Sequence, residues 1–569
     1  MSTNSRLLLY KKISRVSQNG KKFKPSAAAT RLHLKLDKNS REFFFTLPLR
    51  SKQYDVRDEV LNLSKNDSDQ FLENVEVNEK NQKEIHFKLH KENYVKGLLE
   101  STSHGITPPE FMWETPNRVL VEFSSPNIAK PFHVGHLRST MIGNYIANVN
   151  NYFKNDVKRI NYLGDWGTQF GFVQLGLSLA NVTDEALKND PMRALYNAYV
   201  HANKLAENDS TIADQAREIF QKLETGDESN FSEWKSFRKY TIEELERTYN
   251  RIGVKFDIYE WESMYNIKKV NSILSDMEKM KLLTMDSENR KVVQLNEKKS
   301  IPIIKSDGSS LYITRDVAAA IQRFEKHNFD KMYYVVDNAQ TSHFMNLFSV
   351  LNAMKLPWAD RLVHVKFGKI KGMSTRKGTA IFLQDILDET KNVMKEKQLE
   401  SPTTKVNLDY DHPSTEILGI SAVVVNDLRH KRHQDYDFDW DKALDVKGDT
   451  GVSMQYAHCR LVSLEKNSGA TIASECIPSL LQEPVAEDLI FCIGRFDEVL
   501  LKSYQELEPY ILVHYLFTLS HAIGKALQVL KIKGEEEELA RQRLLLMHSA
   551  RKVLNHGMRL LGLTPLSEM

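Results

Sequence analysis

Cysteine is scarce in this chain of 569 residues, which contains Cys459, Cys476 and Cys492 and no other. Their number is odd and no two of them form a CxxC pair, so the sequence predicts neither a disulfide framework nor a structural zinc site. Long apolar runs are also absent: the best candidate, YILVHYLFTL, is far shorter than the roughly 18 residues of a membrane-spanning helix. We therefore expect a soluble protein in a reducing compartment, with no membrane partner.

Acidic residues are missing from the first 36 positions, which hold nine Lys or Arg residues and no Asp or Glu. Serines are interspersed among these basic residues, as is typical of a mitochondrial transit segment. A secretory signal fits poorly, because its apolar core would have to be the short run LLLY. The alternative is a basic arm that holds RNA. We predict a transit peptide within residues 1–40 and a location in the mitochondrial matrix.

Net charge is low, because the chain has 78 basic and 75 acidic residues and therefore a formal charge of +3. This balance is too mild to indicate a nucleic-acid partner by itself. Apolar residues make up 41% and charged residues 27%, as in globular proteins. The length exceeds one hydrophobic core and suggests roughly three to four domains.

The middle of the chain begins with a strand, a glycine loop, a helix and a second strand. RVLVEFSS (118–125) is rich in β-branched and aromatic residues, and Pro126 ends it. From Val134 apolar residues recur every three or four positions, which indicates an amphipathic helix. KRINYLGDWG then provides the second strand. This order predicts an α/β fold with a doubly wound, Rossmann-like parallel sheet.

Further patterns divide the remaining chain. Residues 41–110 read as a small α/β domain, and 111–441 as the Rossmann-like domain with a charged helical insertion at about 175–300. Alternation in SLYITRD, DKMYYVVDNAQ and RLVHVKFG suggests the second half of the sheet, with the helix HFMNLFSVLNAM between the last two. Residues 442–569 have helical spacing throughout and predict an all-α bundle.

The motif HVGH places His133, Gly135 and His136 at the start of the predicted helix. A glycine there allows close approach of a nucleotide, and the helix N-terminus supplies N–H donors for phosphate. Imidazoles at this turn can stabilise charge that develops on phosphoryl oxygens. Two histidines that merely cap the helix are the structural alternative, and a zinc site is a weaker one.

A basic glycine loop follows a late predicted strand in FGKIKGMSTRKGTAIFL, at residues 371–378. Such a loop can close on a polyphosphate. An ordinary solvated turn is the alternative. The presence of HVGH on the same sheet favours the phosphate interpretation.

Four motifs in this order resemble those of the arginyl-tRNA synthetases, a family of class I aminoacyl-tRNA synthetases. They are SSPNIAKPFHVGHLRST, NYLGDWGTQFG, SLYITRDVAAA and GDTGVSMQYAHCRL, and the resemblance extends from about Val119 to the C-terminus. With its basic N-terminus and short N-terminal domain, the chain is similar to mitochondrial animal members. The resemblance implies a ligase that activates arginine with ATP and transfers it to the 3′-terminal adenosine of tRNA-Arg. It also implies Mg²⁺ as a companion of ATP and arginine activation that depends on bound tRNA; we expect a monomer.

The resemblance assigns the ATP site to the two signatures. It implies that His133 and His136 stabilise the α-phosphate and that Gly135 leaves room for adenine. The second signature usually reads Lys-Met-Ser-Lys-Ser, whereas this chain has Met373 and Arg376 at the lysine positions, followed by Lys377. We therefore hypothesise that Lys130 supplies much of the charge on the pyrophosphate side, with Arg376 as a planar cation on the loop.

The arginine pocket is predicted from charge and spacing. Tyr312 and Asp316 share a face if their segment is helical, so the Asp316 carboxylate can meet a guanidinium. The resemblance adds Glu122, Asn127 and Gln340. The alternative for Asp316 is a carboxylate that stabilises a helix N-terminus.

The C-terminal bundle resembles an anticodon-binding domain, and the match implies tRNA contacts at Tyr456 and Met569. Aromatic rings stack on unpaired bases. Ser453 departs from relatives that often have an aromatic residue there, and Tyr456 could alternatively be a half-buried core residue. Two rival functions remain: another nucleotidylyltransferase, which would not need the bundle, and a non-catalytic RNA-binding relative.

Overall fold

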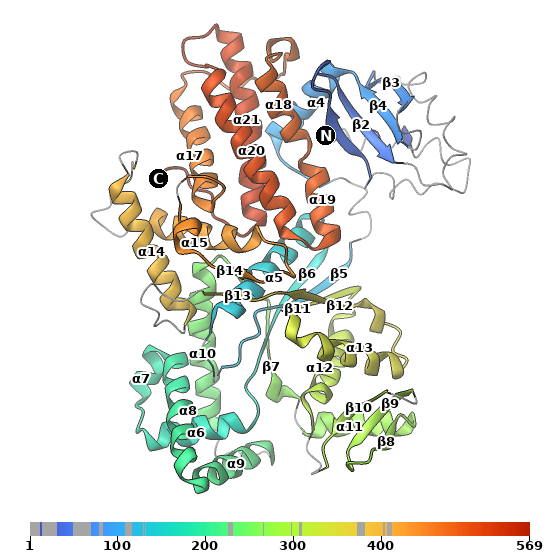
Figure 1. Cartoon of the computed structure of the whole chain (residues 1–569), viewed down its shortest axis with the longest axis vertical. Helices are drawn as coiled ribbons and strands as arrows, with labels where there is room; N and C mark the ends of the chain where they lie inside the picture. The colour runs from blue at the N-terminus through green and yellow to red at the C-terminus, as the bar shows by residue number, and fades with distance from the viewer. Residues whose placement is uncertain are drawn as a thin grey trace.

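The computed structural model describes residues 9, 12–13, 31–48, 70–78, 84–108, 116–128, 130, 132–225, 231–265, 267–296, 299–306, 310–372, 382–401, 404, 406, 412–445 and 447–569. Figure 1 shows a central sheet with the C-terminal helices above it and a small N-terminal sheet beside those helices. The helices α6 to α13 and a second small sheet lie below.

The central sheet has five strands in the order β12-β11-β5-β6-β7, and every neighbouring pair is parallel. Its strands are β5 (Arg118–Glu122), β6 (Asp156–Leu163), β7 (Ile258–Trp261), β11 (Lys331–Asp337) and β12 (Leu362–Phe367). The doubly wound prediction is confirmed. The strand order reverses between β5 and β11, and ligands of such sheets bind at the carboxyl ends of the strands beside that reversal.

Three helices border this reversal: α5 (Val134–Tyr152), α12 (Tyr312–His327) and α13 (Thr341–Ala353). The predictions for α5 and α13 are confirmed, whereas that of a strand over SLYITRD is wrong, because α12 begins at Tyr312. Ile313, Val317 and Ala320 are buried at helical spacing, so burial on one helix face outweighs the short alternation.

The segment 175–300 departs in part from the expected helical insertion. Helices extend through α6 (Thr168–Leu179), α7 (Asp184–Asn189), α8 (Pro191–Asn208), α9 (Ser210–Thr225) and α10 (Phe231–Arg251). Beyond them β7 joins the central sheet, α11 spans Ile267–Lys279, and β8 (Leu283–Met285), β9 (Lys291–Asn296) and β10 (Lys299–Ile304) form an antiparallel sheet. A wholly helical insertion is therefore wrong: these strands are only three to six residues long and leave a weak periodic signal.

The N-terminal sheet has the order β1-β2-β4-β3 and is antiparallel. Its elements are β1 (His33–Leu36), β2 (Phe43–Pro48), β3 (Leu72–Val77) and β4 (Glu84–Leu89), followed by α4 (Lys91–His104). Because β1 pairs with β2, the expected boundary at residue 40 is wrong, and the folded unit begins before it. Most of residues 1–30 lie outside the described residues.

Helices dominate the C-terminal part, where the sequence predicted them from residue 442 onward; the first three begin before that boundary. They are α14 (Leu383–Glu400), α15 (Pro413–Leu428), α16 (Trp440–Ala443), α17 (Gly451–Asn467), α18 (Pro484–Gly494), α19 (Phe496–Glu506), α20 (Pro509–Val529) and α21 (Glu537–Leu560). Two short strands, β13 (Ile370–Lys371) and β14 (Tyr436–Asp437), pair beside the central sheet. Among the described helices, none combines the length and apolar character needed to cross a membrane.

Candidate functional site

The backbone turns sharply between β5 and α5 through two serines in an unusual conformation. Ser124 has a φ of 69° and Ser125 a φ of 45°. The Ser124 N–H donates to Ser139 Oγ at 2.9 Å, and the Ser125 N–H donates to Asn161 Oδ1 at 3.1 Å. Left-handed residues other than glycine cluster at functional sites, where surrounding bonds must maintain them. The turn leads to Asn127, which forms a parallel bridge with the loop after β6.

Two histidines cap the start of α5. His133 is the N-cap residue, and its Nδ1 accepts the Gly135 N–H at 3.0 Å. The Nδ1 of His136 accepts the His133 N–H at 3.2 Å. A Cβ on residue 135 would lie 2.9 Å from Cε1 of His133, so the glycine makes room for this ring. The capping interpretation is therefore correct as geometry, and it also determines the orientation of both rings.

Burial keeps these two imidazoles neutral. It lowers the pKa of His136 to about 3, and the charges of His133 and Lys130 add to the effect. Burial, and then the Lys130 charge, also lowers the pKa of His133. A neutral imidazole whose Nδ1 accepts a hydrogen bond carries its proton on Nε2. The start of α5 thus offers imidazole N–H donors, backbone N–H groups and the exposed Lys130 cation, which together suit a phosphate.

A buried ion cluster lies at the carboxyl ends of β5 and β7. Arg323 of α12 is 2% exposed; it pairs with Glu122 and donates from Nε to Glu260 Oε2 at 2.8 Å. Its guanidinium lies 4.9 Å from the centre of the Tyr162 ring. Burial raises the pKa of Glu122 to about 7 although Arg323 opposes the rise. The carboxylate that the resemblance implied for arginine binding is therefore held by an arginine of the chain itself.

The first turns of α12 and α13 bring three of the implied arginine ligands into one region. Tyr312 is 61% exposed, and a Cβ on Gly167 would lie 3.7 Å from its hydroxyl, so this tyrosine faces the loop after β6. One turn later, Asp316 Oδ2 lies 2.6 Å from Nε2 of His343 on α13. Gln340 is the exposed N-cap residue of α13, three positions before His343.

Carboxyl groups outnumber guanidinium groups in this region. The five interacting carboxyl groups are Glu122, Asp165, Glu260, Glu262 and Asp316. The three guanidiniums paired with them belong to Arg238, Arg315, 3.2 Å from Glu262, and Arg323. Burial raises the pKa of Glu262 to about 7, with Arg315 opposing and Asp316 adding to the rise. Such an excess of acceptors favours a cationic ligand.

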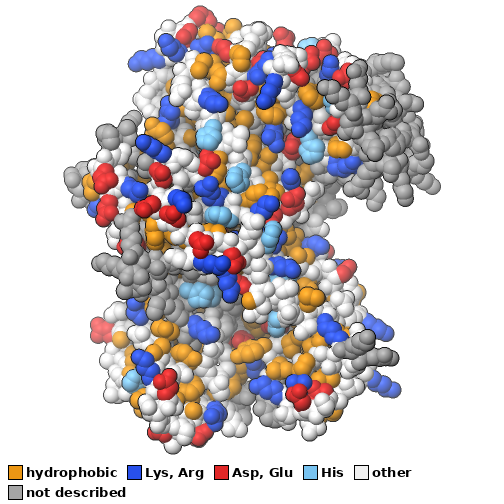
Figure 2. Space-filling view, in the orientation of Figure 1, with side chains coloured by type: hydrophobic (Ala, Val, Ile, Leu, Met, Phe, Trp, Pro, Cys, Tyr) orange, Lys and Arg blue, Asp and Glu red, His pale blue; other side chains and the backbone are white. Residues whose placement is uncertain are grey.

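The basic signature loop is described only at its base. Met373, Arg376 and Lys377 lie outside the described residues. Before them, the Lys369 N–H donates to Asp435 Oδ1 at 2.7 Å, and Lys371 Nζ lies 3.4 Å from Asp435 Oδ2. The pairing of β13 with β14 fixes where the loop begins. Figure 2 shows a hollow at mid-height of the molecule, below the C-terminal helices, with His, Lys and Arg side chains around it.

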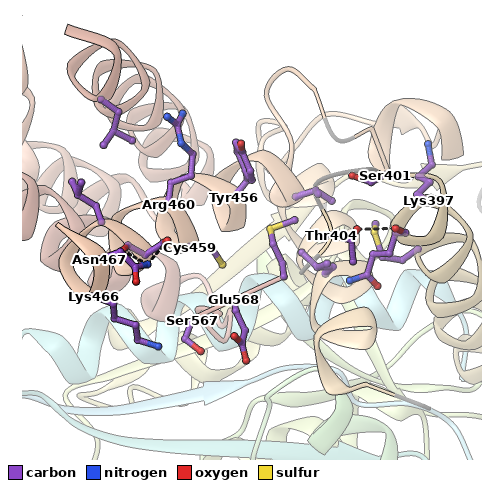
Figure 3. Close-up of a pocket in the computed structure, with 18 of the residues that line it drawn as sticks. Lys397, Ser401, Thr404, Tyr456, Cys459, Arg460, Lys466, Asn467, Ser567 and Glu568 are labelled. Carbon is purple, nitrogen blue, oxygen red and sulfur yellow. Dashed lines mark hydrogen bonds between the residues drawn. The ribbon is translucent and has the colours of Figure 1, made fainter. Parts of the chain in front are cut away.

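A second candidate site lies in the C-terminal part, in a cavity of about 960 Å³ between α14, α17 and the chain end. Tyr456 and Met569 both line it, so the structure brings the two implied tRNA contacts together. Figure 3 shows Tyr456 and Arg460 extending from α17 and Lys397 from α14 on the opposite side. Tyr456 is 44% exposed, so part of its ring is accessible from this cavity.

Several residues of the site escaped the sequence reasoning: Ser124, Ser125, Glu260, Arg323 and His343. A signal existed for Arg323, because it continues the buried face of α12 three positions after Ala320. The serine backbone angles have no signal in the residue types. Within the described ranges, no three His, Cys, Asp or Glu side chains are arranged to hold a metal ion.

Family models and curated relatives both match most of the chain. Residues 110–440 match the family model of the class I tRNA synthetase (R) catalytic domain, and residues 454–569 match the DALR anticodon binding domain. The Bos taurus protein named "Probable arginine--tRNA ligase, mitochondrial" is 42% identical over 494 residues, 85% of each chain. The Saccharomyces cerevisiae cytoplasmic arginine–tRNA ligase is 43% identical, covering 79% of this chain and 76% of its own. The Thermus thermophilus arginyl-tRNA synthetase structure shares the fold, with a TM-score of 0.81 at 20% identity over 99% and 100% of the two chains.

Proposed function

The chain belongs to the arginyl-tRNA synthetases of class I, and we propose that it serves mitochondrial translation through the sites described above. It is an arginine–tRNA ligase, with ATP, arginine and tRNA as substrates. The basic, acid-free N-terminus and the similarity to mitochondrial relatives support the location, although a cytoplasmic relative is equally similar. Import of a fusion to residues 1–32, which precede β1, into isolated mitochondria tests it; failure of import would contradict it.

The start of α5 is the proposed ATP site. Its two Nε2–H groups can donate to the phosphoryl oxygens as negative charge develops on them. Because the two rings are neutral, they have no additional proton to lose during the reaction. Lys130, exposed next to them, adds a cation on the side where pyrophosphate leaves, while Gly135, Met373, Arg376 and Lys377 complete the site by resemblance. Mg²⁺ enters with ATP as part of the substrate.

Lys130 has a direct test. Lys130→Ala should slow adenylate formation by roughly a hundredfold or more, as expected for loss of a transition-state cation. A rate near that of the unaltered enzyme would show that the charge comes from elsewhere, with Arg376 as the remaining candidate. Binding of arginine alone should be unchanged.

The arginine pocket is proposed at the first turns of α12 and α13. The observation that carries this assignment is the excess of carboxylates around Asp316, which remains partly exposed while Glu122 and Glu260 are buried. Asp316 would hold the guanidinium, with Tyr312 and Gln340 beside it and Asn127 near the α-ammonium; Glu122 shapes the wall through Arg323. Asp316→Asn should raise the KM for arginine far more than the KM for ATP, and an equal rise in both would indicate a structural role.

Transfer needs tRNA, and the cavity between α14 and α17 is the proposed anticodon site. Tyr456 offers an exposed ring for stacking, Arg460 and Lys397 offer charge to the RNA backbone, and Met569 closes the lining.

We propose the division into a leader, an N-terminal domain, a catalytic domain to residue 441 and an anticodon-binding domain from 442, acting as a monomer. Sedimentation of the purified chain checks the last point.

One measurement tests the whole assignment: arginine-dependent exchange of pyrophosphate into ATP, with and without tRNA-Arg, across a panel of amino acids. Exchange with arginine alone among the amino acids, and only with tRNA present, is the expected result. A folded preparation that binds tRNA but catalyses no exchange would replace this proposal with the RNA-binding function.

A further inference from the structure

His343 makes a side-chain contact that neither the sequence motifs nor the proposed ligand set accounts for. It stands in the first turn of α13, and its Nε2 lies 2.6 Å from Oδ2 of Asp316 on α12. Both side chains are 26% exposed, so the contact lies at the border of the pocket and not in the core. It also joins the helix that carries Tyr312 and Asp316 to the turn that carries Gln340.

We propose that His343 is a positioning residue for arginine recognition, which holds the Asp316 carboxylate so that its remaining oxygen positions face the guanidinium. This inference rests on the proposed role of Asp316 in the arginine pocket. His343 itself would touch no substrate atom.

The chemistry of the carboxylate explains why such a support is needed. The terminal torsion of an aspartate is broad, so an unsupported carboxylate samples many planes. A guanidinium binds best through two parallel hydrogen bonds, which require the two groups to share one plane. An ionised carboxylate has about four acceptor positions, and the bond from His343 uses one of them. One bond thus fixes the plane and leaves enough acceptors for a bidentate ligand.

The surroundings of His343 favour donation from its Nε2. Burial acts to lower the pKa of His343, but the hydrogen bond and charge of Asp316 outweigh it and the pKa is raised. Whether the ring is neutral or protonated, an Nε2–H can donate to Asp316. The Phe344 ring meets the His343 ring edge to face with 5.5 Å between ring centres, and His364 stacks on the same Phe344 ring at 4.5 Å. This packing restricts the imidazole and makes it a firm support.

The test compares His343→Leu and His343→Gln in arginine-dependent pyrophosphate exchange with tRNA at saturation. His343→Leu should raise the KM for arginine roughly ten- to a hundredfold, the worth of a hydrogen bond to a charged group, with the KM for ATP changed less than about twofold. His343→Gln should recover much of the loss, because an amide N–H can replace the imidazole donor. His364→Leu is the control for a general loosening of the packing around Phe344. It removes the other histidine that contacts this ring and should leave the KM for arginine nearly unchanged.

A double variant separates this inference from the proposed pocket. If His343 acts through Asp316, His343→Leu added to Asp316→Asn should raise the KM for arginine little beyond Asp316→Asn alone. Fully additive effects, or no effect of His343→Leu while Asp316→Asn still raises the KM for arginine selectively, would overturn the role of His343 and leave the pocket standing. If Asp316→Asn itself shows no selectivity for arginine, the proposed pocket fails first.

Discussion

Arg138 of α5 and Asp427 of α15 form an ion pair with 3.3 Å between Nε and Oδ1, and each side chain is only 1% exposed. Arg138 also donates from Nη1 to the carbonyl oxygen of Gly368 at 2.6 Å, just before β13. The Tyr436 hydroxyl donates to Asp427 Oδ1 at 2.8 Å. One buried charge therefore ties the helix that begins after His133 to the segment that leads into the basic loop.

Arg138→Met should destabilise the protein by about 3–5 kcal/mol, because it leaves Asp427 buried without its counter-ion. Burial already raises the pKa of Asp427 to about 6, although Arg138 opposes the rise. A carboxyl group with a raised folded pKa contributes most stability below its unfolded pKa and loses it as the pH rises through the folded value. Without Arg138 the pKa of Asp427 should rise further. The difference in unfolding free energy between variant and parent should therefore be smaller at pH 5 than at pH 8.

Urea unfolding at both pH values checks this expectation. The double variant Arg138→Met/Asp427→Leu should regain much of the loss, since no unpaired charge remains. Arg217→Met, which breaks an ion pair with Asp214 on the surface, is the control and should change little. An equal loss for Arg138→Met at pH 5 and pH 8 would contradict the charge argument.

Gly135→Ala should lower pyrophosphate exchange strongly with a modest loss of stability. The added Cβ would lie 2.9 Å from the His133 ring, so the imidazole must leave its capping position. Loss of a cap costs about 0.5–2 kcal/mol, while a displaced Nε2–H donor can cost roughly a hundredfold in rate. Gly524→Ala is a matched control in α20, where an added Cβ meets no atom within 4 Å, and helix propensity should make it neutral or stabilising. Equal activity in both variants would show that the ring position is unimportant.

His136 should appear in nitrogen NMR spectra as a neutral Nε2–H tautomer that does not titrate between pH 5 and 8, and the pKa of His133 should lie below its ordinary 6.5. Burial holds the folded pKa of His136 at about 3, below its ordinary 6.5. Protons therefore favour the unfolded chain, and the contribution of His136 to stability is complete above about pH 6.5 and declines toward pH 3. His343, whose pKa is raised by Asp316 against the effect of burial, should titrate above pH 6.5 and serves as the internal contrast. Titration of both capping rings near pH 6.5 would remove the basis for neutral donors.

Much of the fold followed from periodicity, and the failures have physical causes. The helix α5 was predictable because its apolar positions repeat over 19 residues, whereas SLYITRD alternates over too few positions to reveal that α12 starts inside it. The strand β1 was hidden in a basic segment, because four residues paired with β2 leave almost no pattern.

The candidate site, too, was predictable only in part. His133 and His136 could be predicted because their motif is contiguous, and Tyr456 and Met569 because the resemblance implied them. Arg323 and His343 act through partners from distant segments, Glu122 and Asp316, which no local pattern brings together. Residues that hold a site together are therefore harder to predict than those that a motif names.

Tyr456→Ala should weaken tRNA binding without affecting arginine activation once tRNA is saturating. Stacking of a base on an aromatic ring is worth about 1–3 kcal/mol, so the KM for tRNA should rise roughly five- to a hundredfold. Tyr456→Phe keeps the ring and should stay close to the parent enzyme. Met285→Ala removes a comparably exposed apolar side chain from β8, at the opposite end of the molecule in Figure 1, and should have no effect on tRNA. If the alanine and phenylalanine variants lose the same amount, the hydroxyl and not the ring contacts the RNA; if neither loses anything, the cavity beside α17 is not the anticodon site.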